Sequence, residues 1–270
     1  MPFTLSHAAA VLPFLRRDGA GRGPLVPSLL VAGSFAPDVT YFAAGAVPGA
    51  MEFGDVTHSF PGVLTVDVAI ALGLVGLERL IREPVLALLP RRVRGRVGSL
   101  LRGRAGLPWS PGWWYVSAVL GAVTHVVWDA FTHPGRWGSR VIPALDEKVA
   151  GSPLYWWVQY GSSAVALGVL GVFVWRALRG CSEPAEELSG ASVRHRFAGF
   201  ALIGACVCGC AAIRVRRWLS YVHDSGLPWK PWDIIPTLCF GAGAGLGLGV
   251  VLFALVSRVR VGRVFGGAVG

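Results

Sequence analysis

Long apolar stretches constrain this chain more than any other feature of its sequence. A helix needs about 20 consecutive apolar residues to cross roughly 30 Å of hydrocarbon. The stretches that approach or exceed this length are 63–81, 113–131, 153–178, 197–213 and 235–257, and a weaker one is 25–47. We therefore expect an all-α fold, a polytopic transmembrane helix bundle with about five to six spans.

Composition also indicates a bilayer as the main solvent. Hydrophobic residues make up 53% of the chain and charged residues only 15%, a balance outside the usual range of soluble domains. Tryptophans, whose rings prefer the headgroup level, gather near the ends of the apolar stretches: Trp113, Trp114, Trp156, Trp157, Trp175, Trp218, Trp229 and Trp232. The glycine-rich run at 241–249 would let helices in lipid approach each other closely.

The formal net charge of +10 reflects arginines that lie in short runs between the apolar stretches. Such runs indicate topology and contact with anionic lipid headgroups, and we expect no nucleic-acid partner. Arginine is densest over 82–104, so the positive-inside rule predicts that the loop 82–112 is cytoplasmic. Because successive spans cross the bilayer in alternate directions, residues 132–152 and 214–234 should then lie outside the cytoplasm. The second of these loops conflicts with the rule, because it carries Arg214, Arg216, Arg217 and Lys230.

Polar residues suited to chemistry are concentrated in the first part of the chain. We expect residues 1–160 to form a functional helical membrane core, and 161–270 to add transmembrane helices without a clearly separate domain. The first basic pair follows the first apolar run instead of preceding it, so we expect the N-terminus to be retained. The cysteines of the CVCGC run at 206–210 would fan around a helix axis, which favours small buried residues over metal ligands.

One apolar stretch carries two ionisable side chains at helical spacing. His125 and Asp129 are four residues apart and share a helix face, and His133 continues that face up to Pro134. An imidazole and a carboxylate one turn apart are able to bind one divalent ion, or to hydrogen-bond across helices. Ionisable residues inside apolar spans are costly, so this face is a candidate functional site, whereas hydrogen bonding across helices would be a purely structural role.

Three further residues lie in polar breaks between the apolar stretches of the first half. They are His7 in FTLSH, Asp38 in GSFAPD and His58 in DVTHSFPG. Each alone fits a cap or a turn. Together with His125 and Asp129 they favour a metal site. Asp67, in the first long stretch, either orients a ligand histidine or pairs with a polar neighbour.

Four ordered motifs carry a resemblance to known families: MPFTLSHAAAVLP, GSFAPDVTYF, THSFPG and GAVTHVVWDAFTHPG. Over most of residues 1–160 the chain resembles an uncharacterised family of bacterial membrane proteins with a domain of unknown function. The same order is similar to predicted membrane-bound metal-dependent hydrolases and, more distantly, to bacterial zinc-dependent phospholipase C. The resemblance implies a multi-pass protein of the bacterial cytoplasmic (inner) membrane and metal ligation by His7, Asp38, His58, His125, Asp129 and His133.

One departure from the phospholipase pattern limits this comparison. That pattern continues with another histidine and a His-x-x-x-Glu pair, and this sequence has no His-x-x-x-Glu. We therefore expect one or two Zn²⁺ ions instead of three, with Asp146, Glu147 or His223 as substitute ligands. The resemblance also requires His7 to reach the site, so segment 25–47 must be a broken or re-entrant helix instead of a full span.

The expected function is hydrolysis of a phosphodiester or ester, such as that of a lipid, by metal-activated water. Asp38 and Asp129 are the candidate catalytic residues, as ligand or as base. The alternative is a non-enzymatic membrane protein, a transporter or an assembly or structural factor, whose polar residues line a path or fix helix contacts. Convergence of the candidate ligands on one point distinguishes the first function from the second.

Overall fold

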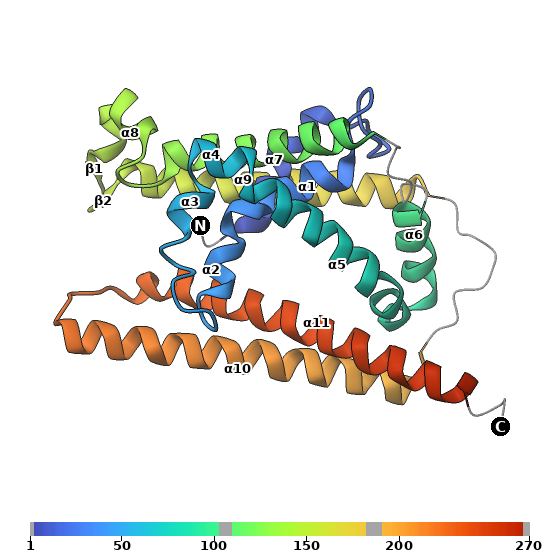
Figure 1. The fold of residues 1–270 in the computed structure, drawn as a ribbon. Helices are drawn as coiled ribbons and strands as arrows, with labels where there is room; N and C mark the ends of the chain where they lie inside the picture. Colours follow the sequence, from blue (N-terminus) through green and yellow to red (C-terminus); the bar gives the residue numbers. More distant parts are fainter. Residues whose placement is uncertain (1–2, 103–109, 182–190, 267–270) are drawn as a thin grey trace.

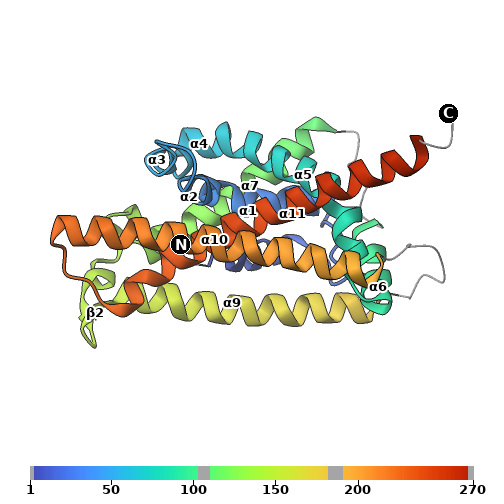
Figure 2. The ribbon, with the colours of Figure 1, turned by 90° about the horizontal axis from the view of Figure 1, so that it is seen from below.

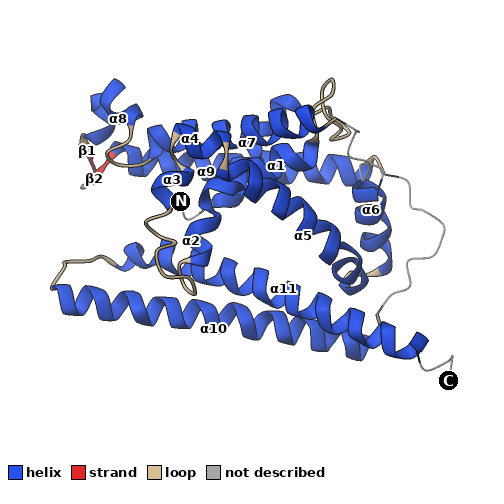
Figure 3. Cartoon of the chain, in the orientation of Figure 1, coloured by secondary structure: helices blue, strands red, loops and turns tan. Residues whose placement is uncertain are grey.

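The computed structural model describes residues 3–102, 110–181 and 191–266. Nearly all of this chain is helical (Figure 3), and a short hairpin of β1 (Lys148–Val149) and β2 (Ser152–Pro153) is the only sheet in the described part. The α-helices are α1 (Pro27–Phe35), α2 (Val39–Ala43), α3 (Gly54–Thr57), α4 (Phe60–Leu64), α5 (Val66–Leu88), α6 (Arg91–Arg102), α7 (Pro111–Thr132), α8 (Trp137–Val141), α9 (Leu154–Arg179), α10 (Val193–Ser225) and α11 (Ile234–Gly266). The 3₁₀ helices are η1 (Thr4–Phe14), η2 (Ala36–Asp38), η3 (Pro143–Asp146) and η4 (Pro231–Asp233).

Two layers of helices are visible in Figure 1. The long pair α10 and α11 lies below the shorter helices of the first half, and α11 contacts α5 and α2. Seen from below, α5 and α9 lie on opposite sides of that pair (Figure 2). The all-α prediction is confirmed.

Local signals explain where several helices begin and end. Proline stands at the start of α1 and of α7, where its missing N–H is not needed. Ser59 caps α4 by accepting a hydrogen bond of 3.1 Å from the Gly62 backbone N–H. α10 ends at Ser225 and is followed by Gly226, whose φ of 60° is left-handed, a conformation that favours glycine.

The first half is organised around a close crossing of α1 and α7. A Cβ atom on Gly33 would lie 2.2 Å from the Ala118 carbonyl oxygen, and one on Gly121 would lie 2.2 Å from the Leu30 carbonyl oxygen. Only glycine allows the two backbones to approach this closely. Buried apolar residues in and next to α1, α5 and α7 form the core beside the crossing: Val26, Leu29, Ala32, Ala36, Val68, Ala71, Val75 and Ala118.

The first eleven-residue helix, η1, is a 3₁₀ helix, a geometry that rarely persists beyond one turn. It packs against α9, α1 and α7. Val11 lies in a small core with Leu15 and Leu30, and the Ser6 hydroxyl donates to Ser163 of α9 at 3.3 Å. The neighbouring helices therefore hold η1 in place and bring its buried residues to α7.

Three described helices are long and apolar enough to cross a membrane: α9, α10 and a segment from Pro231 to Arg258 that contains most of α11. Of the most apolar windows of α9 and α10, only 17% and 11% is buried inside the protein. Their apolar side chains therefore face outward, as in a helical membrane protein. The predicted five to six spans are not confirmed.

Two of the predicted spans correspond to helices outside this group. Segment 63–81 falls within α4 and α5, and α5 carries Glu78, Arg79, Arg82 and Glu83 in its second half. Segment 113–131 lies inside α7. Segment 25–47 is not one helix but α1, η2 and α2 in succession, which agrees with the broken helix that the resemblance requires.

Two segments predicted as loops are largely helical in their described residues, which corrects that part of the prediction; the side of the membrane on which each lies stays a prediction. Loop 82–112 contains the end of α5 and the whole of α6, where arginines alternate with apolar residues at helical spacing; Arg104 lies outside the described residues. Loop 214–234 begins inside α10, which continues to Ser225.

The arginines at the end of α10 have a specific role in packing. Arg214 donates to the Tyr41 carbonyl oxygen at 2.7 Å, and Arg217 donates to the Gly45 carbonyl oxygen at 2.7 Å. These carbonyls lie at the C-terminal end of α2, where helix carbonyls lack partners within the helix. The arginines therefore provide hydrogen-bond donors for the carbonyls of α2, which explains positive charge in a segment that alternation of the predicted spans places outside.

Candidate metal centre

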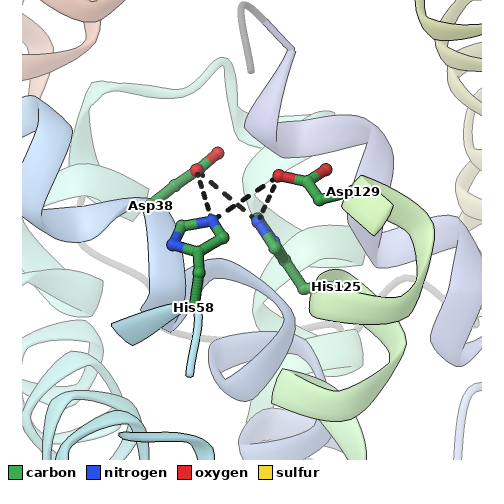
Figure 4. Close-up of side chains that lie close together, drawn as sticks. All are labelled: Asp38, His58, His125 and Asp129. Carbon is green, nitrogen blue, oxygen red and sulfur yellow. Dashed lines mark ion pairs between the residues drawn. The ribbon is translucent and has the colours of Figure 1, made fainter. Parts of the chain in front are cut away.

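Three separate parts of the chain bring four buried ligand atoms together (Figure 4). Asp38 is the last residue of η2, His58 follows the last residue of α3, and His125 and Asp129 lie on one face of α7. Their exposed fractions are 0%, 7%, 0% and 4%, respectively. One nitrogen or oxygen of each residue lies within 4.8 Å of the other three. We call these four residues the polar cluster.

Three of the four distances between histidine nitrogens and aspartate oxygens in the polar cluster match those between ligands of one ion, and the fourth is slightly longer. His125 Nε2 lies 3.5 Å from Asp38 Oδ1 and 3.4 Å from Asp129 Oδ2, and His58 Nε2 lies 3.8 Å and 3.5 Å from the same two oxygens. Good N–H to oxygen hydrogen bonds are shorter, at about 2.7 to 3.2 Å. Zinc bonds of about 2.0 to 2.2 Å in a tetrahedron separate neighbouring ligand atoms by about 3.3 to 3.6 Å.

Backbone carbonyls fix the orientation of both imidazoles. His125 Nδ1 lies 2.7 Å from the Ser34 carbonyl oxygen, and His58 Nδ1 lies 2.8 Å from the Gly54 carbonyl oxygen. A carbonyl only accepts, so each Nδ1 carries a proton, and in the neutral form of each ring Nε2 would present a lone pair to the cluster. This is the arrangement in which histidine binds a metal.

The carboxylate of Asp38 is held from one side only. Its Oδ2 accepts a hydrogen bond from the Thr4 hydroxyl, whereas Oδ1, which faces the two histidines, has no hydrogen-bond partner among the described residues. His125 Nε2 is buried without a partner as well. Buried polar atoms without partners are costly. A divalent ion between them would satisfy both, so the residues present fit such an ion.

His7 lies directly beside the polar cluster. Its ring stacks on that of His125 with centroids 3.7 Å apart, and its Nε2 lies 3.4 Å from Asp129 Oδ1. Burial lowers the pKa of His7 to about 3, and repulsion from His125 acts in the same direction. The ring is therefore neutral at pH 7, the form that binds a metal. Asp129 thus presents one oxygen to the polar cluster and the other to His7.

His133 occupies a marginal position. It follows the end of α7 with extended backbone, and its Nδ1 is 3.6 Å from Asp129 Oδ2. Its Nε2 lies 3.0 Å from the Gln159 side-chain amide, which donates to it. Burial lowers the pKa of His133 to about 4. The ring therefore contacts the site, but the nitrogen that points away from Asp129 already has a partner.

The predicted substitute ligands do not reach the cluster. Asp146, Glu147 and His223 are exposed, and none joins the group of converging ligand atoms among the described residues. The cysteines of α10 remain free thiols outside that group. Asp67 is fully buried and neither of its carboxylate oxygens has a hydrogen-bond partner in the described chain, so it does not hydrogen-bond to a ligand histidine.

Sequence reasoning missed the residues that surround the cluster. Thr4 holds Asp38, and Gln159 contacts His133 from α9. A cavity of about 270 Å³ adjoins His58 and Asp129 and is also lined by Arg136 and Arg140. The two arginines follow Asp129 closely in the chain, but only the turn after α7 shows that they face the site.

Comparisons with known proteins locate the chain in a family but give it no activity. Neither the curated proteins nor the solved structures contain a match to this chain. A family model matches residues 1–255, well beyond the part in which the motifs were recognised. The chain therefore belongs to the family described as Domain of unknown function (DUF4184).

Proposed function

We propose that this protein is a membrane-bound metal-dependent hydrolase that uses activated water to cleave a phosphodiester or an ester. The observation that carries the proposal is the convergence of two Nε2 atoms and two carboxylate oxygens, with both imidazoles oriented by backbone carbonyls. A transport path would string such residues along the bilayer instead of gathering them at one point.

A divalent ion such as Zn²⁺ held by the polar cluster would lower the pKa of a bound water toward about 7 and polarise the bond to be cleaved. Asp38 and His125 lie on the buried side of the cluster, so ligation is the role we assign to them. His58 and Asp129 line the cavity, through which a substrate would approach. With only the polar cluster occupied, Asp129 would keep Oδ1 free and would be the residue best placed to accept a proton from the attacking water.

Asp129 also supports a site for a second ion. Its Oδ1 and His7 Nε2 are 3.4 Å apart, both are buried, and neither has a hydrogen-bond partner within the described residues. A carboxylate that bridges two ions would use one oxygen for each. We propose one ion in the polar cluster and a second, weaker site between Asp129 and His7.

A lipid is one substrate that fits the setting. The three helices suited to crossing a membrane would fix the polar cluster relative to the bilayer, so an ester in a lipid headgroup reaches the site while its acyl chains stay in hydrocarbon. The inner membrane remains the proposed location, with α6 facing the cytoplasm because its arginines favour anionic headgroups on that side.

Metal content of the full chain purified in detergent tests the proposal. Elemental mass spectrometry on wild type should find about one to two zinc, manganese or iron ions per chain, the number that the cluster and the His7 site would hold. The double variant His125→Ala, Asp129→Ala should lose them. His223→Ala, which removes an exposed histidine away from the site, should retain them. If wild type contains no stoichiometric metal, even after reconstitution with excess zinc, the proposal of a metal-dependent hydrolase would be overturned.

A further inference from the structure

Two arginines stand beside the polar cluster without an acidic partner. Arg136 and Arg140 line the same cavity of about 270 Å³ as His58 and Asp129. No carboxylate of a described residue lies within ion-pair distance of either guanidinium, and the one hydrogen bond found for Arg140 goes to the Gly135 carbonyl oxygen at 3.5 Å. Within the described chain, neither guanidinium is therefore held in an ion pair, and both line the cavity.

A neutral carboxylic ester would leave both guanidinium groups without a partner. A phosphoester carries negative charge on non-bridging oxygens, and guanidinium binds such oxygens through paired, charge-assisted hydrogen bonds. The cavity also has a volume suited to a small head group and not to a large apolar ligand.

We propose that Arg136 and Arg140 bind the non-bridging oxygens of a phosphoester whose phosphorus faces Asp129 and His58. This inference rests on the proposed function for its reaction. Water adds to phosphorus, the bond from phosphorus to the alcohol oxygen breaks, and the alcohol leaves with a proton that originates from the water. The phosphate group of the product would stay hydrogen-bonded to both arginines. The shared chemistry is the phosphoester anion, whether it belongs to a lipid headgroup or to a water-soluble molecule.

Binding of inorganic phosphate to the full chain, measured by equilibrium dialysis with and without zinc, tests the recognition step alone. Arg136→Gln should weaken phosphate binding by about tenfold or more, because it removes charge-assisted hydrogen bonds. Arg140→Gln should weaken it less, because Arg140 is more exposed. Arg92→Gln removes an exposed arginine of α6 and should leave binding unchanged. Zinc content should be equal in all four proteins.

Failure of this inference is distinguishable from failure of the proposed function. One decisive result is equal phosphate binding by wild type and by an Arg136→Gln, Arg140→Gln double variant at equal zinc content. It would overturn the proposal that the substrate is a phosphoester and would leave the proposal of a hydrolase that acts on other esters. Wild type that binds no phosphate would do the same. Arginine-dependent phosphate binding by a chain that never takes up metal would support the inference and overturn the hydrolase.

Hydrolysis assays identify the source of the phosphoester. Zinc-loaded wild type should cleave bis(4-nitrophenyl) phosphate, vesicles of phosphatidylglycerol, or both, and the faster substrate shows whether water-soluble or lipid esters are preferred. Arg136→Gln should lower kcat/KM for these substrates by about tenfold or more while changing that for 4-nitrophenyl acetate by less than about twofold. An equal loss on phosphoester and acetate would contradict recognition of phosphate.

Discussion

In both the first half of the chain and the long helices of the second half, glycines let two helices pack closely, but the two contacts have different roles. In the first half, Gly33 and Gly121 bring α1 and α7 into backbone contact. In the second, Gly241, Gly245 and Gly249 lie at intervals of one turn on α11, where a Cβ would meet α10 at 2.8, 2.3 and 2.8 Å. Small residues at this spacing are typical of helix pairs in lipid.

The α1–α7 contact and the α10–α11 contact differ in the residues that lie next to them. The crossing of α1 and α7 lies next to the hydrogen bond between Ser34 and His125, so it helps to fix a ligand of the polar cluster. The contact between α10 and α11 joins two helices with largely apolar surroundings and no member of the cluster. Close packing of α1 and α7 therefore helps to position a residue of the polar cluster, whereas close packing of α10 and α11 only joins the two helices.

The largest effect should come from the polar cluster itself. Asp129→Asn keeps the shape of the side chain but removes the charge that faces both His125 and His7. Zinc affinity, measured by competition with a chelator, should fall by more than the roughly 10- to 100-fold typical of an outer-shell partner. Asp146→Asn, at an exposed site, is the matched control. Unchanged affinity in Asp129→Asn would remove Asp129 from the ligand set.

A second test separates α1 from α7. In Gly121→Val, the new Cβ would overlap the Leu30 carbonyl oxygen, so we expect a loss of about 1 to 3 kcal/mol in the free energy of unfolding. Because Asp38 and His125 would move apart, zinc affinity should fall as well. Gly112→Val lies in open space at the start of α7 and should change neither. A destabilised variant with full zinc affinity would show that the crossing does not position the cluster.

The corresponding change in the second half should affect stability alone. Gly245→Val would place its Cβ 2.3 Å from the Cys206 carbonyl oxygen, and the free energy of unfolding should again fall by about 1 to 3 kcal/mol. Zinc affinity of the folded fraction should stay at the wild-type value. Gly247→Val, with no atom near its Cβ, serves as control. If Gly245→Val lowered zinc affinity as much as Gly121→Val, the distinction between the two regions would be lost.

The smallest effect should come from Thr4. Thr4→Val preserves the shape of the side chain but removes the hydroxyl that donates to Asp38. A hydrogen bond of this kind contributes about 1 kcal/mol or somewhat more, so zinc affinity should fall several-fold, with Thr4→Ser restoring most of it. Thr65→Val removes a hydroxyl that bonds the Pro61 carbonyl oxygen in an exposed position and should have no effect on zinc. Equal affinities of Thr4→Val and wild type would show that Asp38 needs no support from η1.

Local geometry explains which parts of the site the sequence could predict. His125 and Asp129 share a face because helical spacing alone places them there. His133 does not continue that face, since α7 ends at Thr132 and the backbone becomes extended before Pro134. Convergence of His7, Asp38 and His58 depends on long-range packing, which their spacing in the sequence does not predict. The resemblance of the ordered motifs to known families predicted it instead.

Long-range contacts also explain most of the errors in the fold. Hydropathy ends the fourth apolar stretch at 213, but α10 continues because Arg214 and Arg217 find carbonyl partners on a distant segment. The arginine-rich segment before α7 folds as α6 because its apolar residues recur at helical spacing. The division of the chain at residue 160 stays a prediction, although Ser6 and Ser163 contact each other across it.

The dispersed origin of the polar cluster has a consequence for biogenesis. Synthesis proceeds from the N-terminus, so a nascent chain that ends before α7 contains Asp38 and His58 but neither His125 nor Asp129. The Ser6 contact that helps to hold η1 arrives later still, with α9. The early helices must therefore begin to fold with an incomplete site. A ligand bound by all four residues would be acquired late in assembly, after most of the first half has left the ribosome.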